Sequence, residues 1–333
     1  MHMSEIVNKK GFFEAVFKGR NPFWAFIAVF LLVVLGYIVG QIPFSIVAIL
    51  RGMKAGMEGE PIDFDQIQQG DLSVLGLDLN LSLFLLLLSF AGATAGLVLG
   101  VQWLNKKSWR TLINYQGTLC WKKIGFGFGF WLILGLLVES FALITSWDDY
   151  KFSFSLFSFF LLLVIALTLL PIQTSFEELF FRGWLMQNLG YYLNSKVIAL
   201  LLSTLCFAAM HFMNPEVHEY GLGPMMIYYA QAGLLLGIIT VLDDSLELAL
   251  GAHFATNFFG AVLVNYEAGA LQTYSLLKNT ATLDVTSVNI GFFFISIIFI
   301  LVCYKKYNWR LSKLFDPIQR PEDDPIAISE NQD

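Results

Sequence analysis

Long apolar runs recur along the chain and are separated by short polar segments. Each run holds roughly 20 residues, the length that a helix needs to cross about 30 Å of hydrocarbon. We therefore expect an all-α fold, a polytopic transmembrane helical bundle of about eight membrane helices. The expected spans lie near residues 23–48, 81–104, 125–146, 153–175, 197–213, 224–241, 246–265 and 287–303.

The composition supports a membrane protein. Of the 333 residues, 56% are hydrophobic and 14% are charged, whereas soluble domains average about 25% charged residues. The chain therefore lacks the polar surface that would coat a water-soluble globule. This excludes a soluble cytoplasmic enzyme, a disordered chain and a nucleic-acid binder, and it makes the lipid bilayer a partner. The oligomeric state stays open.

The positions of the basic residues predict the orientation in the membrane. If the N-terminus is cytosolic, sixteen of the twenty Lys and Arg residues lie in cytosolic segments, as the positive-inside rule requires. We therefore expect a multi-pass membrane protein with both termini in the cytosol. Short external loops favour a bacterial inner (plasma) membrane.

The chain divides into three parts. Residues 1–20 form a basic cytosolic N-terminus, and residues 21–305 form the transmembrane helical domain. Residues 306–333 are polar and rich in Pro and Asp, so we expect a disordered cytosolic tail. The acidic segment 51–71 is expected to form an external loop.

Ionisable and amide residues gather in apolar segments at about 150–265. A charged group at the bilayer centre costs at least about 2.5–3.5 kcal/mol, so such groups usually face a protein interior and have a function. They form three groups: Glu177, Glu178 and Arg182; His211, four residues after Phe207; and His253 with Asn257.

Helical geometry separates the roles of the two glutamates. Glu178 and Arg182 are four residues apart, about 40° around a helix, and can neutralise each other. Glu177 lies about 140° from Arg182 on the same helix. We therefore interpret Glu178 and Arg182 as structural support and Glu177 as the reactive carboxylate. His253 and Asn257 are also four apart and share one helix face.

Depth in the membrane gives a second indication. If the chain turns near residues 190–195, Glu177 and His211 are level to within about 5 Å on antiparallel helices. His253 aligns with them if this hairpin protrudes roughly 10 Å from the membrane. The site would then lie beneath the cytosolic face. Residues 153–190 would span roughly 57 Å as one helix, so either Pro171 kinks it or its start lies along the membrane interface.

A carboxylate, two imidazoles and an amide indicate hydrolysis. Glu177 and His211 can share a water molecule and remove its proton as it attacks a carbonyl carbon. His253 and Asn257 can donate hydrogen bonds to the resulting oxyanion, contacts worth about 3–4 kcal/mol each where they have been measured.

The residues form three motifs in order: EExxxR as Glu177 to Arg182, FxxxH as Phe207 to His211, and HxxxN as His253 to Asn257. In these motifs the chain resembles the CPBP family of membrane proteases, which contains the CAAX-prenyl endopeptidase and bacterial Abi-type proteins. The resemblance covers about residues 150–265. It implies an α-helical bundle with a cytosol-facing cavity, and it places the protease core at about residues 150–265. It also implies water activation by Glu177 and His211, and oxyanion stabilisation by His253 and Asn257.

A zinc-dependent mechanism is the chemical alternative. Two histidines and a glutamate can hold zinc, and His211, His253 and Glu177 would be the ligands. The chain has no HExxH motif, so it is not a zincin-like protease. Glu178, the base left over in that scheme, is better placed to pair with Arg182. We therefore expect no metal cofactor.

We expect an intramembrane endopeptidase that cleaves a membrane-associated protein or peptide substrate near the cytosolic face. Two alternatives remain, because buried Glu, Arg and His residues can also hold a bundle together or line a proton path. One is a non-proteolytic membrane scaffold or bacteriocin-immunity-type protein. The other is a proton-coupled transporter.

Overall fold

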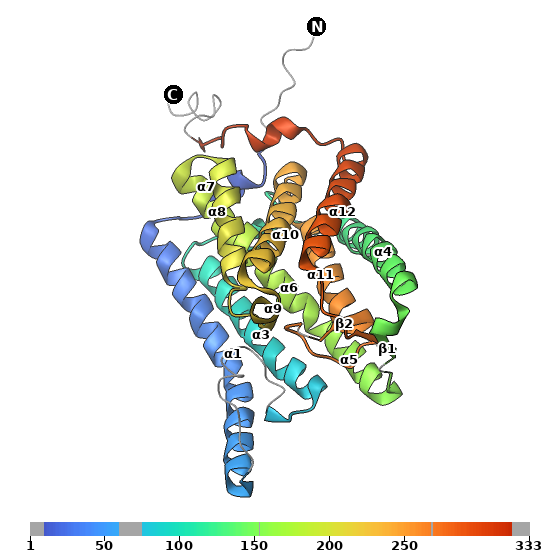
Figure 1. Ribbon diagram of the computed structural model, residues 1–333. Helices are drawn as coiled ribbons and strands as arrows, with labels where there is room; N and C mark the ends of the chain where they lie inside the picture. The colour runs from blue at the N-terminus through green and yellow to red at the C-terminus, as the bar shows by residue number, and fades with distance from the viewer. Residues whose placement is uncertain (1–9, 60–74, 153, 268, 322–333) are drawn as a thin grey trace, which may run out of the picture.

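The computed structural model describes residues 10–59, 75–152, 154–267 and 269–321 as a bundle of helices (Figure 1). This confirms the expected helical membrane bundle. Six helical stretches of the described residues are long and apolar enough to cross a membrane. They are α1 (Phe23–Glu58), α3 (Leu79–Trp103), α4 (Trp121–Thr145), the stretch Leu156–Leu193, α10 (Leu222–Asp243) and α12 (Val285–Lys306).

The expected count of about eight spans is not confirmed. The fifth and seventh expected spans correspond to α8 (Lys196–Ala209, 14 residues) and α11 (Glu247–Phe258, 12 residues). At about 1.5 Å per residue they extend roughly 21 and 18 Å, less than the thickness of the hydrocarbon core. α8 carries Phe207, and α11 carries His253 and Asn257, so both short helices contribute to the predicted site.

The long stretch Leu156–Leu193 is not one regular α-helix. It contains α5 (Leu156–Thr168), α6 (Leu170–Glu178), the π-helix η5 (Leu179–Met186) and α7 (Gln187–Leu193). The break between α5 and α6 falls at Leu169, two residues before Pro171, which cannot donate a backbone hydrogen bond to the preceding turn. The π-helix begins directly after Glu178. Such segments are often found at functional sites.

The chain turns at the two places where the sequence predicted turns, near residues 190–195 and at Asp243–Asp244. The expected turn near 190–195 forms at Asn194, which adopts the left-handed conformation between α7 and α8. Asp244 does the same between α10 and α11. The short helix α9 (Pro215–Tyr220) follows α8, and the π-helix η6 (Phe259–Leu263) extends α11.

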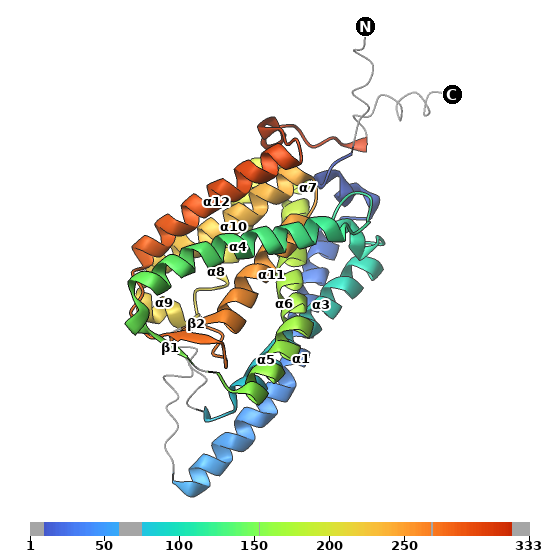
Figure 2. The ribbon, with the colours of Figure 1, turned by 90° about the vertical axis from the view of Figure 1, so that its right-hand side faces the viewer.

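The helices α1 and α3 pack at very short range. A Cβ atom added at Gly92 of α3 would lie 2.1 Å from the carbonyl oxygen of Gly36 in α1. Small residues of this kind let two membrane helices bring their backbones together. Figures 1 and 2 both show α1 running beside α3. Figure 2 also shows α4 crossing α11, against which it packs.

A small sheet lies at the end of the bundle away from α7 (Figure 1). Its strands are β1 (Tyr150–Phe152), β3 (Leu277–Asn279) and β2 (Val264–Tyr266), in the order β1-β3-β2. β3 pairs antiparallel with β1 and parallel with β2. The hydroxyl groups of Tyr150 and Tyr266 donate to Glu139 of α4 at 2.7 and 2.8 Å. These bonds attach the sheet to the bundle, and the short 3₁₀ helix η4 (Trp147–Asp149) precedes it.

Chain segments near both termini close the end of the bundle next to α7. The 3₁₀ helices η1 (Phe13–Lys18), η3 (Trp109–Leu112) and η7 (Leu311–Leu314) are the regular elements there. Phe12 is fully buried, and Ile318 is also buried. Lys313 donates from Nζ to Leu242 O at 2.9 Å and to Asp244 Oδ2 at 2.7 Å.

Two expectations about the segments outside the spans change. Residues 306–321, which we expected to belong to a disordered tail, are held against the bundle by buried apolar side chains such as Trp309 and by the Lys313 contacts. Residues 51–58, expected in an external loop, continue α1. Residues 60–71 of that loop and residues 322–333 of the tail lie outside the described residues.

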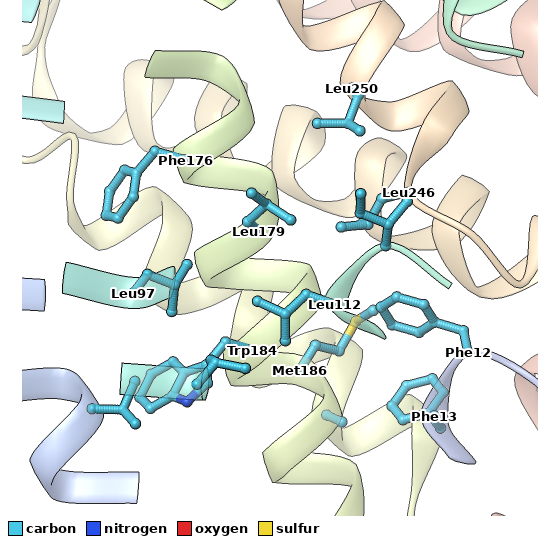
Figure 3. Packing of buried hydrophobic residues seen from close by; sticks show 14 of the residues in the cluster. Phe12, Phe13, Leu97, Leu112, Phe176, Leu179, Trp184, Met186, Leu246 and Leu250 are labelled. Atoms are coloured by element: carbon cyan, nitrogen blue, oxygen red, sulfur yellow. The ribbon is translucent and has the colours of Figure 1, made fainter. Parts of the chain in front are cut away.

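A buried apolar cluster holds one side of the helix that carries the first motif (Figure 3). Phe176 and Leu179, which flank the two glutamates, both belong to it. The cluster also joins α3, the N-terminal segment and the start of α11. Glu177 and Glu178, which lie between Phe176 and Leu179 in the sequence, face His253 farther along α11. The other labelled members are Phe12, Phe13, Leu97, Leu112, Trp184, Met186, Leu246 and Leu250.

Candidate active site

The predicted ion pair between Glu178 and Arg182 forms. Arg182 Nη1 lies 2.8 Å from Glu178 Oε1, and the two side chains are 1% and 0% exposed. Arg182 also donates from Nη2 to the carbonyl oxygen of Gly233 in α10 at 3.1 Å. Its guanidinium lies 4.4 Å from the centre of the Phe207 ring. The pair therefore links η5 to α8 and α10.

His253 of α11 contacts both glutamates. Its Nδ1 lies 2.7 Å from Glu178 Oε1, and its Nε2 lies 3.5 Å from Glu177 Oε2. All three side chains are buried. Glu177 and Glu178 are adjacent and point about 100° apart on the helix, and one imidazole reaches both carboxylates because its two nitrogens lie on different edges of the ring. The helical-wheel argument separated Glu177 from the Glu178–Arg182 pair, whereas in the structure His253 connects them.

Gln173 joins Glu177 to Asn257. Gln173 Nε2 donates to Glu177 Oε1, and Asn257 Nδ2 donates to Gln173 Oε1 at 2.9 Å. Gln173 is buried, and the sequence reasoning missed it. A signal was present, because Gln173 is a polar residue four positions before Glu177 and so lies on the same helix face.

His211 lies just after α8 and is partly buried. Its Nδ1 is 2.8 Å from the carbonyl oxygen of Phe207. Because a carbonyl only accepts hydrogen bonds, Nδ1 carries a proton, and Nε2 is an acceptor in the neutral form of the ring. Phe207 stands next to both histidines, with its ring centre 4.7 Å from that of His211 and 6.0 Å from that of His253.

Tyr229 of α10 holds the ring of His211. The two rings stack with their centres 4.2 Å apart and an angle of 25° between their planes. The Tyr229 hydroxyl donates to Glu216 and accepts from Asn214 Nδ2 at 3.0 Å. The sequence motifs did not indicate this support, because Tyr229 meets Asn214 and Glu216 through the packing of α10 against α9.

The structure thus brings most, but not all, of the predicted residues into one cluster. Glu177, Glu178, Arg182, His253 and Asn257 are joined, directly or through Gln173. No hydrogen bond or ion pair of the described residues connects His211 to this cluster. The aromatic ring of Phe207 lies between them instead.

The zinc alternative does not fit this arrangement. Within the described ranges, no group of three His, Cys, Asp or Glu side chains is placed to hold a metal ion. Both nitrogens of His253 face glutamate oxygens, and Nδ1 of His211 faces its own backbone. The set of His211, His253 and Glu177 is therefore not gathered as a three-ligand site.

A cavity of about 120 Å³ lies beside the cluster, between α4, α10, α11 and α12. Ala255 and Thr256 line it from α11, and the other lining residues are mainly apolar. The predicted site residues Glu177, Glu178, Arg182, His211, His253 and Asn257 are not among its lining residues. This cavity therefore differs from the cavity that the family resemblance implied.

Comparison with known proteins agrees with the motifs. The family model described as type II CAAX prenyl endopeptidase Rce1-like matches residues 154–259, a range that holds all three motifs. The uncharacterized protein YyaK of Bacillus subtilis (strain 168) is 34% identical over 243 residues, which cover 73% of this chain and 78% of that protein. No solved structure matches the chain.

The family match and the apolar helices point to the same class of protein. The matched range runs from the helix that carries the two glutamates to the helix that carries His253 and Asn257. Six helical stretches of the described residues are able to span a membrane, and two of them lie within the matched range. The chain therefore belongs to the Rce1-like family of type II CAAX prenyl endopeptidases, a family of membrane proteases.

Proposed function

We propose that this chain is an intramembrane endopeptidase that hydrolyses a peptide bond near the cytosolic membrane face, with Glu177 as the base. The observation that carries the proposal is the state of the Glu177 carboxylate. Its Oε1 is held by Gln173, whereas its Oε2 is buried, has no hydrogen-bond partner among the described residues, and faces His253 Nε2. Leaving a buried polar atom without a hydrogen-bond partner costs free energy, so such an atom calls for an explanation. A general base supplies one, because the oxygen that receives the proton must be free of other hydrogen bonds.

The proposed reaction uses one of two charge-neutral states of the cluster. Arg182 neutralises Glu178, so Glu177 and His253 together are neutral either as a carboxylic acid beside a neutral imidazole or as a carboxylate beside an imidazolium, which holds the proton instead. With that proton on His253, Nδ1 donates to Glu178 and Nε2–H is also a donor. Glu177 is then an ionised carboxylate. This state supplies both a base and a hydrogen-bond donor, as hydrolysis requires.

The reaction follows from these groups. Glu177 Oε2 takes a proton from a water molecule as the water oxygen attacks the carbonyl carbon of the scissile bond. The carbonyl oxygen becomes an oxyanion that accepts from His253 Nε2–H and Asn257 Nδ2–H. His211 Nε2 becomes a second acceptor for the same water once the Phe207 ring, which lies between His211 and the cluster, moves aside. Proton transfer from Glu177 to the leaving amine completes the cleavage.

The substrate we propose is a membrane-associated protein or peptide. The family description names CAAX prenyl endopeptidases, so a peptide with a prenylated C-terminal cysteine motif is the first substrate class to test. The apolar surroundings of the cluster suit a substrate that enters from the bilayer. No cofactor takes part in the proposed reaction.

The test compares purified wild type with Glu177→Gln on a quenched-fluorescent peptide library that includes farnesylated CAAX-type peptides, with and without a strong chelator. We expect cleavage by wild type alone, unaffected by the chelator. Equal cleavage by both proteins would contradict the role of Glu177. Chelator-sensitive cleavage would favour the zinc mechanism. Absence of cleavage by wild type across the library, with ion-dependent flux in liposomes, would favour the transporter.

A further inference from the structure

Gln173 occupies a position between two groups that the proposed reaction uses. It lies in α6, one helical turn before Glu177, and its side chain is buried. Its amide makes two side-chain hydrogen bonds, one to Glu177 in the same helix and one to Asn257 in α11. None of the three motifs contains this residue.

The orientation of the Gln173 amide follows from the chemistry of its neighbours. An ionised carboxylate only accepts hydrogen bonds, so the amide nitrogen of Gln173 must face Glu177. Its amide oxygen then faces Asn257, and that oxygen only accepts. Asn257 must therefore turn its own amide nitrogen toward Gln173. We name this chain of donors and acceptors the Asn257–Gln173–Glu177 relay.

Each end of the relay leaves one reactive atom available. At Glu177, Oε1 is occupied by Gln173, so Oε2 is the oxygen left to receive a proton. At Asn257, one N–H bond is used by Gln173, and the second N–H is left to donate to an oxyanion. The same bond fixes the plane of the Asn257 amide and so the direction of that second N–H.

We infer that Gln173 is a positioning residue, which through the Asn257–Gln173–Glu177 relay sets the base and one oxyanion donor relative to each other. This inference rests on the proposed function, because it gives Gln173 a role only if Glu177 and Asn257 take part in hydrolysis. The two groups come from different helices, α6 and α11. A displacement of about 1 Å between reacting groups can cost 10²-fold in rate.

The variant Gln173→Met tests the relay. Methionine has a similar length and suits a buried site, but it replaces the amide by a thioether. The matched control is Thr174→Val on the neighbouring position, because the Thr174 hydroxyl donates to the carbonyl groups of Leu170 and Pro171 in its own helix. Both variants are purified from membranes, and their thermal unfolding midpoints are compared with wild type.

Steady-state kinetics on a fluorogenic peptide that wild type cleaves then give kcat and KM. We expect Gln173→Met to lower kcat by about 10- to 100-fold with an unchanged KM, and Thr174→Val to match wild type. If the role of Gln173 were purely structural, Gln173→Met would change the unfolding midpoint and the amount of active enzyme. Its effect on kcat would then not depend on whether Asn257 is present. If Gln173→Met does not fold, Gln173→Asn takes its place, since it keeps the amide but is too short to span both partners.

A double-mutant cycle with Asn257→Ala separates positioning from a general loss of structure. If Gln173 acts partly through Asn257, the loss of kcat in the double variant is clearly smaller than the product of the two single losses. Losses that multiply would overturn the inference. So would a Gln173→Met variant whose kcat equals that of Thr174→Val.

The two proposals fail in different ways. If Glu177→Gln cleaves like wild type, or if wild type cleaves nothing, the proposed function fails and the relay has no reaction to position. If Glu177→Gln is inactive and Gln173→Met is fully active, the proposed function stands and the inference about Gln173 is wrong.

Discussion

The imidazole of His253 contacts Glu178, with Nδ1 lying 2.7 Å from Oε1 of the carboxylate. The two residues are 75 positions apart. Because the same Glu178 oxygen also accepts from Arg182 at 2.8 Å, this contact connects the ion pair of one helix to the imidazole of another. Glu178 thus orients His253, whose second nitrogen is directed at Glu177.

The Glu178–Arg182 pair should be required for stability. We expect Arg182→Ala and Glu178→Gln to lower the thermal unfolding midpoint and the amount of protein in membranes. Each change leaves its partner without its full charge neutralisation in a buried site, and breaking a buried pair costs about 3–5 kcal/mol. Differential scanning fluorimetry in detergent and quantitative blotting of membranes measure both effects. Glu177→Gln is the comparison, with abundance like wild type; an equally abundant Arg182→Ala protein would contradict this role.

The stacking of Tyr229 on His211 should matter for activity. We expect Tyr229→Leu to lower kcat by about 10-fold or more, because His211 loses the ring that holds it in place. Tyr229→Phe keeps the stacked ring and should retain much more activity. It removes the hydroxyl that bonds to Glu216 and Asn214, so its unfolding midpoint should fall. Equal kcat values for the two variants would rule out a role for the stacking.

The buried Lys107 should make stability depend on pH. Burial lowers the pKa of the Lys107 ammonium from 10.5 to about 7, and its Nζ donates to Ala15 O at 3.5 Å. Between pH 7 and pH 10.5 the unfolded chain binds this proton and the folded chain does not. Stability should therefore rise with pH in that window, by at most about 1.4 kcal/mol per pH unit.

The variant Lys107→Met isolates this effect. We expect its unfolding midpoint to exceed that of wild type at pH 7, and the difference to shrink toward pH 9, because wild type gains stability as it loses the proton. Thermal unfolding of both proteins at pH 7, 8 and 9 measures the difference, in which the titration of all other groups cancels. Parallel curves would show that Lys107 does not titrate in this range.

The close packing of α1 against α3 leaves no room for a side chain at Gly92. We expect Gly92→Ala to lower the unfolding midpoint, because its Cβ would lie 2.1 Å from Gly36 O and would force the helices apart. Gly129→Ala in α4 is the matched control, since no atom lies within 4 Å of the added Cβ. Alanine favours a helix over glycine by about 1 kcal/mol, so the control should be as stable as wild type or more so.

The hydrophobic pattern predicted the helical bundle correctly, but it overestimated the lengths of two of its helices. Runs of apolar residues are a local signal of membrane insertion, and six of them correspond to helices long enough to span. The pattern overestimated α8 and α11. There the apolar run continues into residues that leave the α-helix, at His211 after α8 and at the π-helix η6 after α11. Apolar character alone does not report where the backbone hydrogen-bond pattern changes.

The members and the contacts of the candidate site were each predicted only in part. Glu178 and Arg182 pair as expected, because residues four apart on a helix meet whatever the rest of the fold does. The placement of His253 against both glutamates depends on how α11 packs on α6, and the helical wheel of one segment does not contain that information. Gln173 was missed for the same reason, since its second partner, Asn257, is 84 positions away.

The sequence by itself determined that this protein is a helical membrane bundle, which residues are costly to bury in it, and which of them pair along one helix. These properties depend on composition and on spacings within a single helix. Only the tertiary structure decided that His253 touches both glutamates, that Gln173 connects Glu177 to Asn257, and that Tyr229 holds His211. Those contacts join different helices, and their geometry arises from the packing of whole helix faces rather than from any local pattern.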